Sequence, residues 1–244
     1  MNPEGYLGRD KPFMDKRLTG MCVYCGGQDD TDDHVPSKTL LEEPLPAHVP
    51  VVRACAACNA GFSLDEQYLS CFLECVLCGT TDPSGIQRAS IRRTLAGSPP
   101  LAARIAASQT TDESGDLIWQ PEVDRIRRVV LKLARGHAAY ELYPQLEDPD
   151  EVAFVPFLVM SDDERSAFEE VNSGPLQPWP ELGSRAFLRA CGVYPDSEQA
   201  GPLLQAGSWI IVQPGRYRYS VIETGGVLVR IVLSEYLACA VTWE

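Results

Sequence analysis

The sequence predicts an α+β protein with an N-terminal module built around paired cysteines, a central helical region and a C-terminal antiparallel β-meander. Three observations lead to this prediction: two CxxC pairs near the N-terminus, a long amphipathic pattern in the middle, and four strand-like runs at the end. Because composition and pattern change near residues 80 and 150, we divide the chain into residues 1–80, the cysteine module, residues 81–150, the helical region with a basic face, and residues 151–244, the α+β region that carries the sheet.

Composition narrows the class of protein. The chain has 244 residues, of which 45% are hydrophobic and 23% charged, as in an ordinary globular protein. Its formal net charge of -13 argues against a general polyanion binder, so contact with nucleic acid needs a local basic patch or bridging metal ions. The apolar runs are too short for a membrane helix, and Met1–Arg17 lacks the apolar core of a secretory signal, so we expect a cytoplasmic protein.

The cysteine module is expected to end in a helix. Ser63 and Glu66 have the spacing of a capping box, and they open a helical pattern over residues 64–78 that Gly79 closes. Cys71 and Cys75 follow the apolar spacing of that helix, so we expect buried thiols. His48, in a proline-rich connection, is expected on the surface.

The central region contains the clearest amphipathic helix, over residues 121–142. Its apolar positions recur at steps of three and four residues: Val123, Ile126, Val130, Leu133 and His137. His137 on this stripe is expected to be a core histidine. Basic residues on the opposite side of this helix, and three more near residue 90, are candidates for phosphate contact, although a solvated charged face is the alternative: Arg88, Arg92, Arg93, Arg125, Arg128, Lys132 and Arg135.

The last region is expected to begin with a strand at residues 152–160, followed by a short helix that Ser161 and Glu164 cap. Runs rich in β-branched and aromatic residues, separated by turn residues, then predict four strands at residues 209–213, 217–223, 227–233 and 236–243. No catalytic motif occurs in these strands.

The two CxxC pairs, Cys22 with Cys25 and Cys55 with Cys58, predict a structural zinc site. Each pair lets two thiolates on a tight turn reach one ion at about 2.3 Å, and two pairs complete a closed tetrahedral shell. Free core thiols or a redox CxxC are alternatives, but no thioredoxin-like βαβ pattern surrounds either pair. A helical pair, Cys75 with Cys78, could replace one of the two.

Polar residues beside these cysteines are candidates for activating water and for binding a divalent cation. Asp33 and His34 come after the first pair, and Asn59 directly follows the last cysteine. An imidazole with a pKa near 6.5 suits the deprotonation of water, and carboxylate and amide oxygens suit a hard divalent cation. Asp33 and His34 are adjacent, and adjacent side chains of a regular strand point to opposite faces. For both to act on one phosphate, the chain needs a bend or a strand end there, which Pro36 favours. The alternatives to these catalytic roles are that His34 is a solvated loop residue and that Asn59 only forms a turn.

The order CxxC, acidic-His-x-Pro and CxxCN, followed by a helix, resembles the zinc-containing HNH endonucleases of the ββα-metal superfamily over about residues 20–78. The resemblance implies that His34 is the general base and that Asp33 and Asn59 hold magnesium or manganese. Where many members have a second histidine on the helix, this chain offers Asp65 and Glu66 as further candidate ligands.

The resemblance also implies a substrate and a setting. The substrate is DNA, with RNA left open, and restriction and phage defence are common settings for such nucleases. The later regions are expected to bind substrate, a protein partner or a second copy of the chain. The alternative is a non-catalytic zinc-stabilised module that binds nucleic acid or protein.

Overall fold

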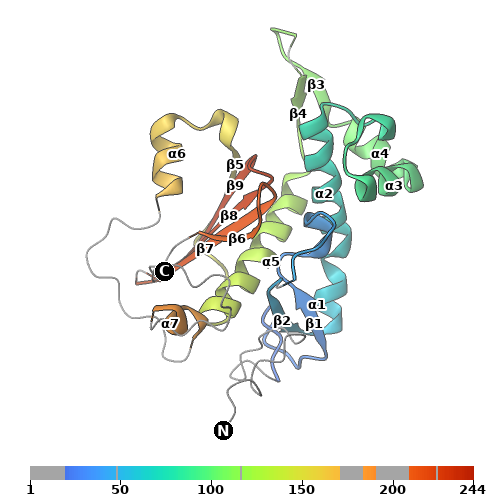
Figure 1. The fold of residues 1–244 in the computed structure, drawn as a ribbon. Coiled ribbons are helices and arrows are strands. Elements are labelled where there is room, and N and C mark those ends of the chain that lie inside the picture. The colour runs from blue at the N-terminus through green and yellow to red at the C-terminus, as the bar shows by residue number, and fades with distance from the viewer. Residues whose placement is uncertain (1–19, 48, 116, 171–183, 191–208, 224) are drawn as a thin grey trace. The chain divides into compact units, whose positions relative to one another are not determined.

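The computed structural model describes residues 20–47, 49–115, 117–170, 184–190, 209–223 and 225–244, so Met1–Arg17 and His48 lie outside the described residues (Figure 1). Two compact units occur, one comprising the described parts of Met1–Ala60 and Val130–Glu244, the other Gly61–Val129. The mixed α+β class, the cysteine cluster near the N-terminus and the C-terminal antiparallel sheet are confirmed. The division at residues 80 and 150 stays a prediction.

The first unit begins with a two-stranded antiparallel hairpin. Strand β1 (Thr31–His34) pairs with β2 (Val51–Ala54) in a regular register, with Asp33 opposite Val52 and His34 opposite Val51. Between them lies a short 3-10 helix, η3 (Lys38–Leu40), and after them comes α1 (Ala56–Gly61). The hairpin therefore brings the two CxxC pairs, which flank it in the sequence, to one end.

The C-terminal sheet has five antiparallel strands in the order β5-β9-β8-β7-β6. The four predicted strands of the meander are confirmed within one residue at each end: β6 (Ile210–Gln213), β7 (Tyr217–Glu223), β8 (Val227–Leu233) and β9 (Leu237–Trp243). Strand β5 (Glu151–Pro156) is shorter than expected, because the chain turns into the 3-10 helix η5 (Phe157–Val159). It pairs with β9 and so becomes an edge of the sheet.

The long helix α5 (Val123–Glu141) packs its C-terminal half on this sheet (Figure 1). The His137 ring stacks on Tyr219 with centroids 3.6 Å apart, and its Nε2 lies 2.7 Å from the Tyr217 hydroxyl. One turn later, Glu141 accepts a hydrogen bond of 2.6 Å from the Tyr219 hydroxyl. Both helical side chains are fully buried, so the expected core position of His137 is confirmed.

The same helix departs from its predicted pattern at two positions. Ile126, Val130 and Leu133 are buried as expected, but Val123 is 55% exposed. Lys132 does not lie on an outer face, because its side chain is only 1% exposed and its ammonium group pairs with Asp33. The expectation of a continuous basic outer face on this helix is therefore wrong at Lys132.

The connection after β1 is tied to the sheet. The Glu42 backbone N–H donates to Gln213 Oε1, and Gln213 Nε2 donates to the Glu42 carbonyl oxygen, each at 2.8 Å. The Arg216 guanidinium pairs with the Glu42 carboxylate at 2.8 Å. Short helices complete the first unit: α6 (Asp162–Glu169) and α7 (Arg185–Ala190). The predicted capping box of α6 is confirmed, with both reciprocal bonds between Ser161 and Glu164 present.

The second unit is mainly helical, as the pattern after residue 86 predicts. Its helices are α2 (Ser63–Cys78), the 3-10 helix η4 (Pro83–Gly85), α3 (Ala89–Gly97), α4 (Pro99–Ala106) and the start of α5. It also contains a small hairpin that no sequence pattern predicted, formed by β3 (Gln109–Thr111) and β4 (Leu117–Trp119). Its core includes Tyr68 stacked on Phe72, with Trp119 edge-on to Phe72. Cys71 and Cys75 lie in this core as expected, and burial raises the pKa of each thiol, to about 11 and about 12.

Helix α2 ends as predicted but begins differently. Gly79 takes the left-handed C-cap position at φ 65°, a conformation that glycine adopts without strain. Ser63 is already helical, Phe62 is the N-cap, and no side-chain cap hydrogen bond forms. The predicted capping box of Ser63 and Glu66 is wrong because α1 leads directly into α2, and the Phe62 carbonyl oxygen accepts from the first backbone N–H groups instead.

Candidate functional site

The first CxxC pair lies in a tight turn. The Cys22 N–H donates to the Gly27 carbonyl at 2.7 Å, and the Gly26 N–H donates to the Cys22 carbonyl at 2.9 Å. Gly26 has φ 72°, a conformation that glycine adopts without strain. The Val23 N–H donates to the Arg53 carbonyl at 3.0 Å, which attaches this turn to β2.

The second pair opens helix α1. Asp30 accepts a hydrogen bond of 2.6 Å from the Ala56 N–H, so a carboxylate caps the positive end of this helix. The Cys58 N–H donates to Cys55 Sγ at 3.4 Å, an N–H···S contact of the kind that stabilises a thiolate. This bond holds the pKa of the Cys55 thiol near 7, whereas burial raises the pKa of Cys58.

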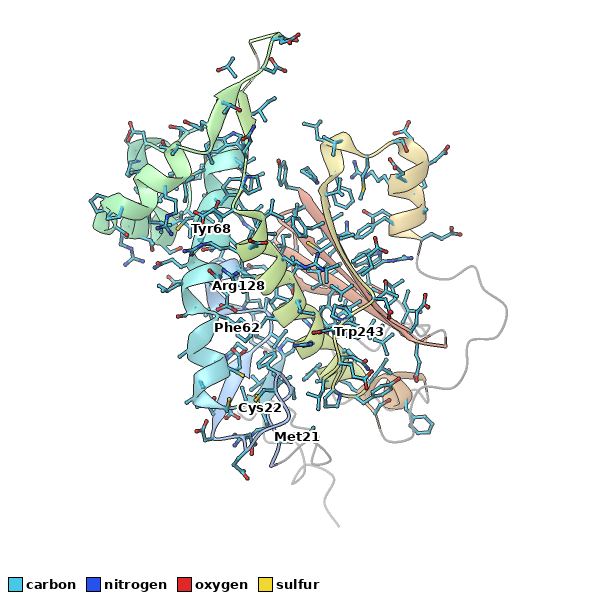
Figure 2. The ribbon with its side chains drawn as sticks, turned by 180° about the vertical axis from the view of Figure 1, so that it is seen from behind. Met21, Cys22, Phe62, Tyr68, Arg128 and Trp243 are labelled. Carbon is cyan, nitrogen blue, oxygen red and sulfur yellow. The ribbon has the colours of Figure 1, made fainter. Side chains whose placement is uncertain are left out.

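The four thiols form a single cluster, which lies around the labelled Cys22 in Figure 2. All four sulfur atoms lie within 4.8 Å of one another, and Cys25 Sγ is 3.8 Å from Cys55 Sγ. A tetrahedron with zinc–sulfur bonds of about 2.3 Å has edges of about 3.8 Å. The donor set and this spacing therefore fit a structural zinc ion, and the cluster uses Cys22, Cys25, Cys55 and Cys58 rather than Cys75 and Cys78.

His34 is the last residue of β1, where the family resemblance expects the general base. The imidazole is half-buried, and it has no hydrogen-bond partner among the residues that the structure describes. Burial, and then the positive charge of Lys38, lowers the pKa of His34 below 6.5. The ring is thus neutral at pH 7 and can accept a proton.

Asn59 reaches back from α1 to β1. Its Nδ2 donates to Thr31 Oγ1 at 3.3 Å and to the Asp32 carbonyl at 3.2 Å. Thr31 and Asp33 share one face of β1, because successive side chains of a strand alternate. The contact places Asn59 beside the face that carries Asp33, and its Oδ1 accepts no hydrogen bond from the described part of the chain.

Asp33 is buried and already paired. Its Oδ2 accepts a hydrogen bond of 2.7 Å from the Tyr24 hydroxyl and lies 2.8 Å from Lys132 Nζ. Its Oδ1 has no partner within the described ranges. Because the β1–β2 register is regular, Asp33 and His34 project from opposite faces. Of the two alternatives expected there, a bend or a strand end, the structure has the strand end, because β1 ends at His34.

The other candidate ligands lie in the second unit. Both carboxylate oxygens of Asp65 are engaged, Oδ1 by Arg125 at 3.1 Å and Oδ2 by Arg128 at 2.7 Å. Glu66 is buried. Apart from the four cysteines, the described ranges contain no group of three or more His, Cys, Asp or Glu side chains at metal-binding spacing.

The basic candidates are not equally accessible. Lys132 and Arg88 are buried, which corrects the expectation that they lie on a surface facing phosphate. Arg92 and Arg93 donate to backbone carbonyls of their own segment, at Ile86 and Ala89. Arg135 donates to the Glu147 carbonyl. Arg128 keeps 54% of its side chain exposed while pairing with Asp65.

The sequence did not predict the two partners of Asp33. Tyr24 lies inside the first CxxC pair, and Lys132, which was expected to contact phosphate, comes from a helix about a hundred residues further along the chain. The sequence of α5 has a single apolar stripe, so it did not indicate that the side carrying Lys132 is also buried, against the hairpin. The bulky aromatic residue between the two cysteines was the one available signal for Tyr24.

No protein-family model matches the chain, and comparisons with curated proteins and with solved structures find no similar protein. The likeness to HNH endonucleases thus depends on the motif residues alone. No helix of the described residues is long and apolar enough to cross a membrane.

Proposed function

We propose that the protein is a metal-dependent HNH-type endonuclease that hydrolyses phosphodiester bonds of DNA, with a four-cysteine zinc ion as scaffold. The observation that carries the proposal is a hairpin with four cysteines at metal-binding spacing at one end and His34 at the end of its first strand. The neutral imidazole, which has no hydrogen-bond partner within the described parts of the chain, supports a role as general base. Asn59 beside the Asp33 face supports a shared cation at those two residues.

In this mechanism each residue has one task. His34 takes the proton from the attacking water. Asp33 Oδ1 and Asn59 Oδ1 would hold magnesium or manganese, which when bound supplies positive charge for the phosphate and the leaving oxygen. Because Asp33 and His34 project from opposite faces of β1, the scissile phosphate must lie at the end of the strand to reach both.

The test uses the purified zinc-loaded chain and supercoiled plasmid. We expect nicking with added magnesium or manganese, loss of at least about a hundredfold in rate for His34→Ala, and unchanged zinc content. Glu113→Ala is the control, because this exposed residue between β3 and β4 makes no hydrogen bond or ion pair with the described residues and is not a candidate site residue. Equal nicking by His34→Ala and the unsubstituted protein would remove His34 from the mechanism.

A specific observation favours a second candidate, a non-catalytic zinc-stabilised module that binds nucleic acid or protein. Lys132 already neutralises Asp33, which faces away from His34, so the same contacts could serve only to join α5 to the hairpin. This candidate predicts one zinc per chain and no cleavage of DNA or RNA with any divalent ion.

A further inference from the structure

The contact between Asp33 and Lys132 brings a positive charge to the carboxylate that the proposed function assigns to a divalent cation. Lys132 Nζ lies 2.8 Å from Asp33 Oδ2, and the two side chains are only 1% and 8% exposed. The ammonium group also lies 5.7 Å from the centre of the Tyr24 ring. Water therefore screens this pair poorly, and the lysine acts as a fixed charge beside the carboxylate.

The two donors to Oδ2 differ in charge. Tyr24 donates a neutral hydroxyl, which orients the carboxylate and leaves its negative charge in place. Lys132 orients the same oxygen but also cancels the charge. A divalent cation on Oδ1 and the ammonium group on Oδ2 would share a single carboxylate. Because both positive charges are buried, their repulsion weakens cation binding by more than the fixed orientation of the carboxylate strengthens it.

We propose that Lys132 is a positioning residue that sets the cation affinity of the site through Asp33, holding Oδ2 and keeping divalent ions weakly bound at Oδ1. This inference rests on the proposed function for its choice of Asp33 as ligand. Lys132 itself contacts neither cation nor substrate. A weakly held ion would bind mainly together with substrate, because phosphate oxygens complete its ligand set.

The test measures manganese affinity of the zinc-loaded chain without substrate, by electron paramagnetic resonance of free Mn²⁺ at pH 8. We expect Lys132→Met to bind Mn²⁺ about tenfold or more tightly than the unsubstituted protein. Tyr24→Phe, the matched control on the same oxygen, should change the affinity less than about threefold. The double variant Lys132→Met with Asp33→Asn should lose the gain, since the effect acts through Asp33.

Unchanged or weaker Mn²⁺ binding by Lys132→Met, or a gain that persists without the Asp33 carboxylate, would overturn the inference. If Lys132→Met does not retain zinc, Lys132→Gln, which keeps a neutral donor, carries the same expectation. The result is separable from the proposed function: plasmid nicking with unchanged Mn²⁺ affinity in Lys132→Met overturns only this inference. Tighter binding through Asp33 with no nicking by the unsubstituted protein overturns only the nuclease.

Discussion

Replacing Gly136 by alanine tests how closely α5 packs against the end of β1. A Cβ at this position would lie 2.7 Å and 2.8 Å from the two γ-methyl groups of Val35, and 3.3 Å from the Tyr24 hydroxyl. Val35 directly follows His34 and is fully buried, so neither side can move away freely. The substitution should therefore destabilise the protein although it occurs inside a helix.

Two effects of opposite sign decide the magnitude. Alanine is favoured over glycine in a helix by about 1 kcal/mol. Overpacking a tight contact costs about 1–3 kcal/mol. We expect a net loss of about 1 kcal/mol in the free energy of unfolding, which lowers the melting temperature by about 2–4 °C for a chain of this size.

The assay is thermal and urea-induced unfolding of the zinc-loaded chain. Gly97→Ala is the control, because Gly97 is also helical and a Cβ there meets nothing within 4 Å. That variant should be as stable as the unsubstituted protein or up to about 1 kcal/mol more stable. If Gly136→Ala matches the stability of Gly97→Ala, α5 does not press on Val35 and the reasoning about this contact fails.

Two further predictions concern zinc and pH. Cys55→Ser should abolish stoichiometric zinc binding and the hydrogen-exchange protection of the β1–β2 amides. The control Cys78→Ser should retain both. Zinc retained by Cys55→Ser would contradict the assigned cluster. Burial holds the pKa of His137 well below 6.5, so between that lowered pKa and 6.5 only the unfolded chain binds the extra proton. Stability should then fall by up to about 1.4 kcal/mol for each pH unit below 6.5. His137→Gln should flatten this dependence in urea unfolding, and parallel curves for the two proteins would contradict it.

Local signals explain what the sequence could predict. The CxxC pairs, the turns between the C-terminal strands and the glycine after α2 are each encoded within a few residues, and the structure has all three. The capping-box pattern occurs twice but forms only at Ser161, where an extended residue precedes the helix. At Ser63 the chain is already helical, so tertiary context decides between two identical local patterns.

The partner of Asp33 could not be predicted in this way. A helical wheel sorts residues into one buried and one exposed side, and it placed Lys132 on the exposed side. In the structure α5 is covered on two sides, by the hairpin through Lys132 and Gly136 and by the sheet through His137 and Glu141. Only the long-range arrangement of the chain reveals that a charged position on such a helix is interior.

The four-cysteine cluster and the Asp33–Lys132 pair are completed at different times during synthesis. All four cysteines have left the ribosome soon after residue 58, so zinc can be bound while most of the chain is still unmade. Lys132 follows only after some seventy further residues, which takes about 4–15 s at ordinary translation rates. Of the two described partners of the Asp33 carboxylate, Tyr24 is therefore already made when the cysteines are complete, whereas the charged one comes only with α5.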